Sequence, residues 1–281
     1  MTGEGASARI ECQAEFHYFA TRKENVMDQQ SMSPSTAAVQ PSSLASRAAD
    51  VFASPSSLFT EVAAAPVRSS SWVMPLILSL CLALAFTYTI YNNPNLRQQV
   101  YDMQEQAFKK AVEKGSMTQE QAQQATERME STGLAMFMVF GGGLAVVTIT
   151  AVFFLAPLVI WALAKFILKY GGAYMKLLEI WGLASFIGIL GTIITLLLMS
   201  VFDSMHASPG GGLLVMGSYD ANSVAHRFLV SMNLITIWQV AVLGIGVGTV
   251  SGGKVGKGLA VMFGLWLLWV IISAVTGFGA R

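Results

Sequence analysis

The sequence has few charged residues, and this scarcity excludes most soluble proteins. Only 12% of the 281 residues are Asp, Glu, Lys or Arg, whereas an average soluble domain has about 25%. A further 54% are hydrophobic, and the mean hydropathy is +0.56. The charges are also unevenly distributed: residues 1–132 hold 10 basic and 13 acidic side chains, and residues 133–281 hold 7 and 3. This distribution predicts a polytopic membrane protein.

Other residue types that carry recognisable chemistry are also scarce. Cys12 and Cys81 are far apart in the sequence, so they predict no disulfide framework. The three histidines have no Cys or carboxylate partner at metal-ligand spacing, so no metal site or cofactor is expected. The net charge of +1 lacks the basic excess that phosphate neutralisation needs, which argues against a nucleic-acid partner.

One segment resembles a catalytic motif. Gly248 to Lys254 matches the first seven positions of a phosphate-binding loop. Val255, however, stands where that loop has the Ser or Thr that holds magnesium, and an apolar helix rather than a strand precedes it. We interpret the segment as a turn, and the sequence predicts no catalytic residues and no enzymatic activity.

The N-terminal region divides into two parts. Residues 1–50 are rich in Ser, Ala, Gln and Pro and show no apolar periodicity, so they predict a disordered tail. Residues 51–70 place Phe52, Leu58, Phe59 and Val62 at helical spacing. This part is expected to form a short amphipathic helix, either lying at the membrane surface or simply leading into the first span.

The first span is expected at residues 71–91, which are uncharged and have Trp72 and Tyr91 at their ends. The polar residues 95–132 follow, and they predict two helices separated by Gly115, in the form of a solvent-exposed hairpin or stalk. Thr118 and Gln121 have the spacing of a capping box at the start of the second helix.

The second span is ambiguous by length. Thirty-four uncharged residues separate Glu130 from Lys165, which is more than the roughly 20 that cross a bilayer and fewer than two spans with a turn need. Read as one span, residues 137–168, this stretch gives five crossings. Read as a hairpin of two spans, it would place the later lysine-bearing turns on the side away from the tail. Because short Lys-rich loops stay cytoplasmic, we prefer one span.

The remaining spans are expected at residues 177–201, 228–250 and 259–278. The fold class is therefore all-α, a polytopic membrane helical bundle with five transmembrane helices, a disordered N-terminal tail and a polar helical insertion after the first span. Positive charge in the turns predicts a cytoplasmic N-terminus and an external C-terminus.

Two sets of residues inside the spans are functional candidates. Small residues at intervals of three or four allow close helix packing in lipid, and they occur at Gly182, Ser185, Gly188, Gly191, Gly244 and Gly248. Polar side chains within a span suggest a functional site by default, and these are Glu179, Asn233 and Gln239. Glu179 follows Lys176 by three residues, so a local ion pair at the interface is expected. Asn233 and Gln239 are expected to point to different helix faces.

Five sequence segments together resemble bacterial members of the Yip-domain family of membrane proteins. They are Phe52 to Phe59, Trp72 to Leu76, Tyr174 to Leu178, Asn233-Leu234 followed by Ile237 to Gln239, and Gly244 to Val247. The likeness covers residues 51 to about 278. It implies a cytoplasmic tail and five spanning helices, in agreement with the count from charge, and the likeness to bacterial members implies a location in the inner (cytoplasmic) membrane of a bacterial-type cell.

The sequence leaves two functional hypotheses open. The first is a non-enzymatic scaffold that contacts membrane lipids and recruits proteins through its tail or the 95–132 segment, with a second copy of the chain among its candidate partners. The alternative is a small transporter or channel in which Glu179, Asn233 and Gln239 line a polar path. The two differ in whether Glu179 opens into a cavity shared with Gln239 or sits beside Lys176.

Overall fold

The computed structural model describes residues 42–131 and 133–277, and the elements below lie in the compact unit Ser43–Arg281. Regular structure in the described residues is helical, which confirms the predicted fold class. The order along the chain is α2 (Leu44–Ala53), α3 (Pro55–Ala64), α4 (Ser70–Asn92), α5 (Pro94–Glu113), α6 (Gln119–Glu130), α7 (Leu134–Phe137), η1 (Met138–Gly142), α8 (Gly143–Leu163), η2 (Ala164–Leu168), α9 (Tyr174–Phe202), α10 (Gly212–Val215), α11 (Val224–Ser231), α12 (Leu234–Val250) and α13 (Val255–Thr276).

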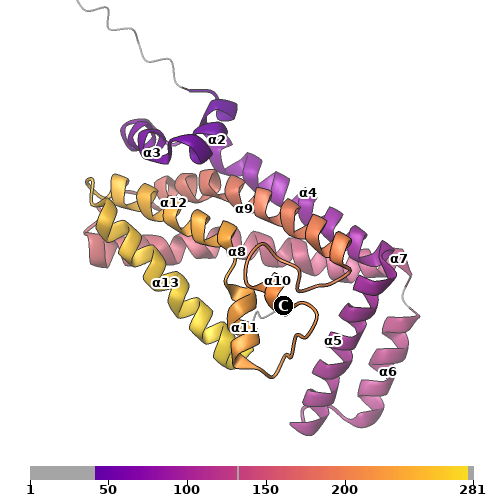
Figure 1. Cartoon of the computed structure of the whole chain (residues 1–281). Helices are drawn as coiled ribbons and strands as arrows, with labels where there is room; N and C mark the ends of the chain where they lie inside the picture. Colours follow the sequence, from indigo (N-terminus) through magenta and orange to yellow (C-terminus); the bar gives the residue numbers. More distant parts are fainter. Residues whose placement is uncertain (1–41, 132, 278–281) are drawn as a thin grey trace, which may run out of the picture. The chain divides into compact units, whose positions relative to one another are not determined.

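Within the described ranges, four helices are long and apolar enough to cross a membrane: Ser70–Asn92, Leu134–Leu168, Tyr174–Phe202 and Val255–Thr276. The shorter apolar helix α12 lies among them and packs against α9 and α13 (Figure 1). The chain is therefore a multi-pass membrane protein.

The long uncharged stretch forms one helix rather than a hairpin. Residues Leu134–Leu168 run continuously through α7, η1, α8 and η2 for 35 residues. Pro157 lies inside α8 without ending the helix, and η1 is a π-helical segment containing Gly141 and Gly142. The helix ends where Lys169 adopts a left-handed conformation, with φ 56°. This arrangement favours the single-span interpretation of the sequence.

The fourth span begins later than expected. The prediction placed it at 228–250, but the chain breaks after α11 and α12 begins only at Leu234. Asn233 causes the break, because its side-chain oxygen accepts hydrogen bonds from the backbone N–H groups of Ile235, at 2.9 Å, and Thr236, at 3.3 Å. An amide that caps a helix start satisfies donors that have no partner within the helix. Hydropathy alone does not detect this boundary.

Helical structure also starts earlier than the expected tail boundary at residue 50. Helix α2 begins at Leu44, with the Ser43 hydroxyl accepting a bond from Ser46 N–H. The tail prediction for residues 1–41 lies outside the described residues. The expected helix within 51–70 corresponds to the end of α2 and the whole of α3.

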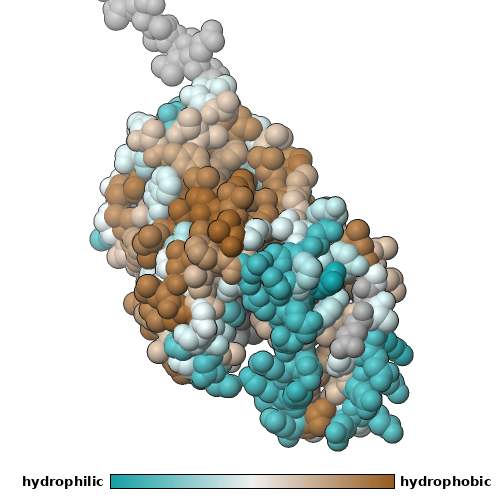
Figure 2. All heavy atoms as spheres, turned by 45° about the vertical axis from the view of Figure 1, so that its right-hand side comes forward, coloured by the Kyte–Doolittle hydropathy of each residue, from teal (hydrophilic) through white to brown (hydrophobic). Residues whose placement is uncertain are grey.

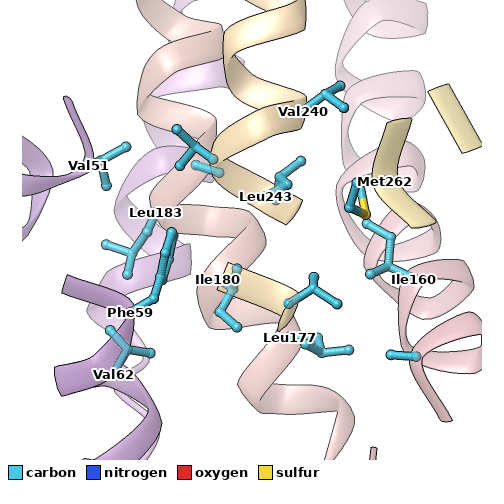
Figure 3. Close-up of a cluster of buried hydrophobic side chains, with 14 of the residues drawn as sticks. Val51, Phe59, Val62, Ile160, Leu177, Ile180, Leu183, Val240, Leu243 and Met262 are labelled. Carbon is cyan, nitrogen blue, oxygen red and sulfur yellow. The ribbon is translucent and has the colours of Figure 1, made fainter. Parts of the chain in front are cut away.

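The main hydrophobic core joins the N-terminal helices to the membrane bundle (Figure 3). Val51 and Phe59, both fully buried, pack with Ile180 and Leu183 of α9. Gly246 of α12 allows this approach, since a Cβ there would lie 2.6 Å from Ile180 and 3.1 Å from Phe59. Helices α2 and α3 are therefore packed on the bundle by their apolar faces.

The polar insertion is a helical hairpin of α5 and α6, at the opposite end of the bundle from the α12–α13 turn (Figure 1). The predicted capping box is confirmed, with Thr118 and Gln121 exchanging side-chain to backbone hydrogen bonds. Hydrophilic residues gather over this hairpin, whereas hydrophobic residues cover the adjoining bundle (Figure 2). Leu96 of α5 is fully buried against Met199 and Met205.

The segment between α9 and α12 folds back against the bundle. Arg227 of α11 donates hydrogen bonds to the carbonyl oxygens of Ala274 (2.7 Å) and Ala221 (2.9 Å). Ala207 is fully buried, and Leu234 N–H donates to the Pro209 carbonyl oxygen. These contacts attach the segment to the ends of α12 and α13.

Candidate functional site: a buried charge cluster

Glu179 of α9 is fully buried and lies at the centre of a cluster of charged groups. Its Oε2 atom is 2.9 Å from Lys176 Nζ, and its Oε1 atom is 3.2 Å from Arg47 Nη1. Oε1 also accepts a hydrogen bond from the Arg68 backbone N–H at 3.2 Å. The carboxylate thus has two cationic partners and one backbone donor, which offset the cost of removing it from water.

The two cations extend the cluster to other segments. Arg47, also fully buried, contacts Glu61 Oε1 at 2.9 Å and the Ser71 hydroxyl at 3.4 Å. Lys176 Nζ donates to the carbonyl oxygens of Val62 and Ala65, each at 2.9 Å. These two carbonyls belong to the C-terminal end of α3, where backbone acceptors lack partners within the helix and a cation is favourable.

The cluster joins four parts of the chain that are distant in sequence. Arg47 comes from α2, Glu61 from α3, Ser71 from the start of α4, and Lys176 with Glu179 from α9. The two carboxylates balance the guanidinium and ammonium groups, so the set has no formal net charge. Breaking one buried contact of this kind costs about 3–5 kcal/mol. The cluster therefore fixes α2 and α3 to the end of the bundle where α9 begins.

Sequence reasoning found only part of this cluster. The expected local pair of Lys176 and Glu179 is present. Arg47 was missed because it fell in the expected tail and is 132 residues from Glu179. The available signal was its position four residues before Val51, which places a cation on the apolar face of an amphipathic helix.

The other two polar candidates lie elsewhere. Gln239 of α12 lines two cavities, of about 740 and 390 Å³, and Asn233 lines the smaller one. Neither cavity, as formed by the described residues, is lined by Glu179. The structure therefore brings Asn233 and Gln239 to a shared cavity, but it does not join them to Glu179 in one polar path.

The small residues mark close approaches between different pairs of helices. A Cβ on Gly182 would lie 2.5 Å from the Ser71 carbonyl oxygen of the α4 N-terminus. Gly188 faces Gln239 and Gly191 faces Ile235, both on α12, and Ser185 lines the larger cavity.

The glycines of α12 itself lie against α13. A Cβ on Gly244 would lie 2.8 Å from Leu259 Cα, and one on Gly248 would lie 2.5 Å from Val255 Cα. Helix α12 therefore approaches the backbone of α13 directly, whereas its contact with α9 sets side chains of α12 against Gly188 and Gly191.

Basic residues gather at the end of the bundle that carries the cluster. Lys254 of the α12–α13 turn donates to the Leu168 carbonyl oxygen at 2.9 Å, so this turn meets the η2–α9 turn. Lys176, which follows the η2–α9 turn, contacts the end of α3. Both lysine-bearing turns and the α2–α3 pair therefore lie at one end. This common location agrees with the charge argument used to count the spans.

Comparison with protein-family models matches residues 49–277 to the Yip1 domain. The matched region runs from within α2 through α13 and includes Glu61, Lys176 and Glu179, whereas Arg47 lies two residues before it. Comparisons with curated proteins and with solved structures gave no match.

Proposed function

The chain belongs to the Yip1 domain family, and from this premise we propose that it is a non-catalytic membrane scaffold that recruits protein partners. The observation that carries the proposal is the buried cluster of Arg47, Glu61, Lys176 and Glu179. It holds α2 and α3 rigidly on the bundle, and the segment that recruits partners, residues 1–42, is attached to α2. The exposed faces of α5 and α6 offer a second surface for protein contacts at the opposite end.

Transport has less support than scaffolding. A proton or ion path through the span would need Glu179 to open into the cavity that Gln239 lines. Glu179 is instead enclosed by Arg47, Lys176 and the Arg68 backbone, and it lines neither cavity formed by the described residues. A carboxylate with three close partners is suited to holding helices together.

We further propose that the clustered end is cytoplasmic in a bacterial-type inner membrane. Lys165, Lys169, Lys254 and Lys257 occupy its two short turns or the helix ends beside them, and short loops rich in lysine stay on the cytoplasmic side. Five crossings then place the α5–α6 hairpin and the C-terminus outside.

Affinity capture from membranes in mild detergent tests recruitment. We expect specific partners of the full chain to be lost when residues 1–42 are deleted, and to be depleted by Arg47→Met, which releases α2. Lys257→Met is the control, because Lys257 is exposed and lies outside residues 1–42, the buried cluster and the α5–α6 hairpin. An unchanged partner set after the deletion would refute recruitment by this segment.

Cysteine labelling tests the orientation independently. In a chain with Cys12→Ser and Cys81→Ala, we introduce Ser116→Cys between α5 and α6, or Lys257→Cys near the α12–α13 turn. A membrane-impermeant maleimide should label Ser116→Cys in intact cells and Lys257→Cys only after permeabilisation. The reverse pattern would invert the topology, and labelling of both in intact cells would contradict the bundle arrangement.

A further inference from the structure

Two cavities in the bundle meet at Gln239. The larger one, which we call the acyl cavity, has a volume of about 740 Å³ and lies among α4, η1, α8, α9 and α12, with α5, α6 and α7 completing its lining and Arg128 of α6 part of it. The smaller one, which we call the polar cavity, has a volume of about 390 Å³ and lies among α9, α12, α13 and the segment before α10. Both are lined by the same four residues at their junction: Phe86, Gly188, Thr192 and Gln239.

The acyl cavity has the length and lining of a site for a hydrocarbon chain. Ala83, Ile90, Phe137, Ile149 and Phe153 are among its lining residues. Its lining on α4 extends over twelve residues, from Ser79 to Ile90, and the eleven steps between them span about 16 Å at 1.5 Å per residue. This is about half of a hydrocarbon core of about 30 Å, which is the depth of one leaflet.

The polar cavity has uncharged hydrogen-bonding groups. Ser208, Ser231, Thr195 and Ser273 contribute hydroxyl groups to its lining. Among the described residues that line it there is no Asp, Glu, Lys or Arg, and His206 is the only titratable side chain. The lining therefore suits an uncharged head group that carries hydroxyl or ester oxygens.

Two residues that line these cavities carry a buried polar group without a hydrogen-bond partner in the described structure. Ser208 lines the polar cavity and is only 8% exposed, and its hydroxyl, which lies beside Gly212, has no hydrogen bond in the described structure. The indole N–H of Trp181, which lines the acyl cavity, is likewise buried without a partner. No hydrogen bond joins the Gln239 amide to another described residue. Unpaired polar groups at membrane depth are costly, so these groups indicate a ligand that supplies polar atoms.

We propose that the joined cavities bind one molecule of an uncharged glycerolipid of the diacylglycerol type. An acyl chain fills the acyl cavity, and the hydroxyl-bearing glycerol end occupies the polar cavity beside Ser208. Gln239, at the junction, hydrogen-bonds the ester group that connects the two parts. An anionic phosphate is disfavoured in the polar cavity, because none of the described residues that line it is cationic and Arg128, the cation of the joined lining, lies on the acyl cavity.

Native mass spectrometry of the full chain in mild detergent tests the proposal, with dioleoylglycerol as the probe and dioleoylphosphatidylglycerol as the competitor. We expect a saturable complex of one dioleoylglycerol per chain, and at least tenfold weaker binding of the phospholipid. Ala145→Phe, which projects into the acyl cavity, should weaken dioleoylglycerol binding at least tenfold. Ala151→Phe, on an exposed position of the same helix, is the control.

Ser208→Ala keeps the test decisive if Ala145→Phe does not fold. It removes a hydroxyl that has no partner in the described structure, so stability should be unchanged while binding weakens about three- to tenfold. Ser200→Ala, an exposed change on α9, should leave binding unchanged. Absence of a saturable complex, equal binding of the phospholipid, or equal effects of the cavity variants and their controls would overturn the proposal.

Discussion

Replacing Arg47 by methionine should release α2 and α3 from the bundle. The substitution keeps an unbranched apolar chain but removes contacts to Glu61, Ser71 and Glu179 at 2.9, 3.4 and 3.2 Å. Removing one partner of a buried pair costs about 3–5 kcal/mol. Glu179 would keep Lys176 and the Arg68 N–H, and the side chain of Glu61 is 32% exposed, so the lower end applies. A loss of about 3 kcal/mol corresponds to roughly a hundredfold change in an equilibrium constant.

Amide hydrogen exchange followed by mass spectrometry measures this release locally. Peptides from α2 and α3 should exchange about a hundredfold faster in Arg47→Met, while peptides from α13 should change little. Lys109→Met is the control, since Lys109 and Glu105 are 67% and 46% exposed and such pairs contribute about 0–1 kcal/mol. If α2 exchange in Arg47→Met rose no more than in the control, the cluster would not be what holds these helices.

Three further predictions concern packing, capping and pH. Gly182→Leu should destabilise the bundle by at least about 2 kcal/mol, because even a Cβ at this position would lie 2.5 Å from backbone atoms of α4. Gly264→Leu is the control, because a Cβ at Gly264 has no neighbour within 4 Å. Equal melting temperatures of the two variants would contradict this prediction. Asn233→Ala should cost about 1 kcal/mol by removing the α12 cap, and denaturant midpoints that match the parent would refute that role. Burial raises the pKa of Tyr170 above its ordinary 10.0, so the folded state favours the neutral phenol. Its contribution to stability is therefore present below about pH 10 and lost as pH rises further, and the alkaline fall in melting temperature should be smaller in Tyr170→Phe.

Long-range hydropathy and local charge patterns were sufficient to predict most of the helical architecture. The uncharged stretch before Lys165 is one helix, as the positive charge of later turns indicated. Thr118 and Gln121 form their capping box because that signal depends only on residues three apart. The pairing of Lys176 with Glu179 is equally local.

Features that depend on tertiary contacts were harder to predict. Arg47 resembles a residue of a polar tail until Glu179 and Glu61 are placed beside it. Asn233 sits in an otherwise continuous apolar stretch, so hydropathy placed it inside a helix that it in fact begins. The two cavities that meet at Gln239 arise from four or more helices, and no pattern within one helix encodes that arrangement.

The length of the Leu134–Leu168 helix has a consequence for the surrounding lipid. Its 35 residues measure about 52 Å along the axis, and even a tilt of about 40° leaves about 40 Å along the bilayer normal. Phe140, near one end, and Phe166, near the other, are 66% and 77% exposed, so apolar surface continues over almost the whole helix. A hydrocarbon layer of about 30 Å is too thin to cover it. This hydrophobic mismatch favours thicker bilayer regions, and lipids with longer chains should collect around the protein.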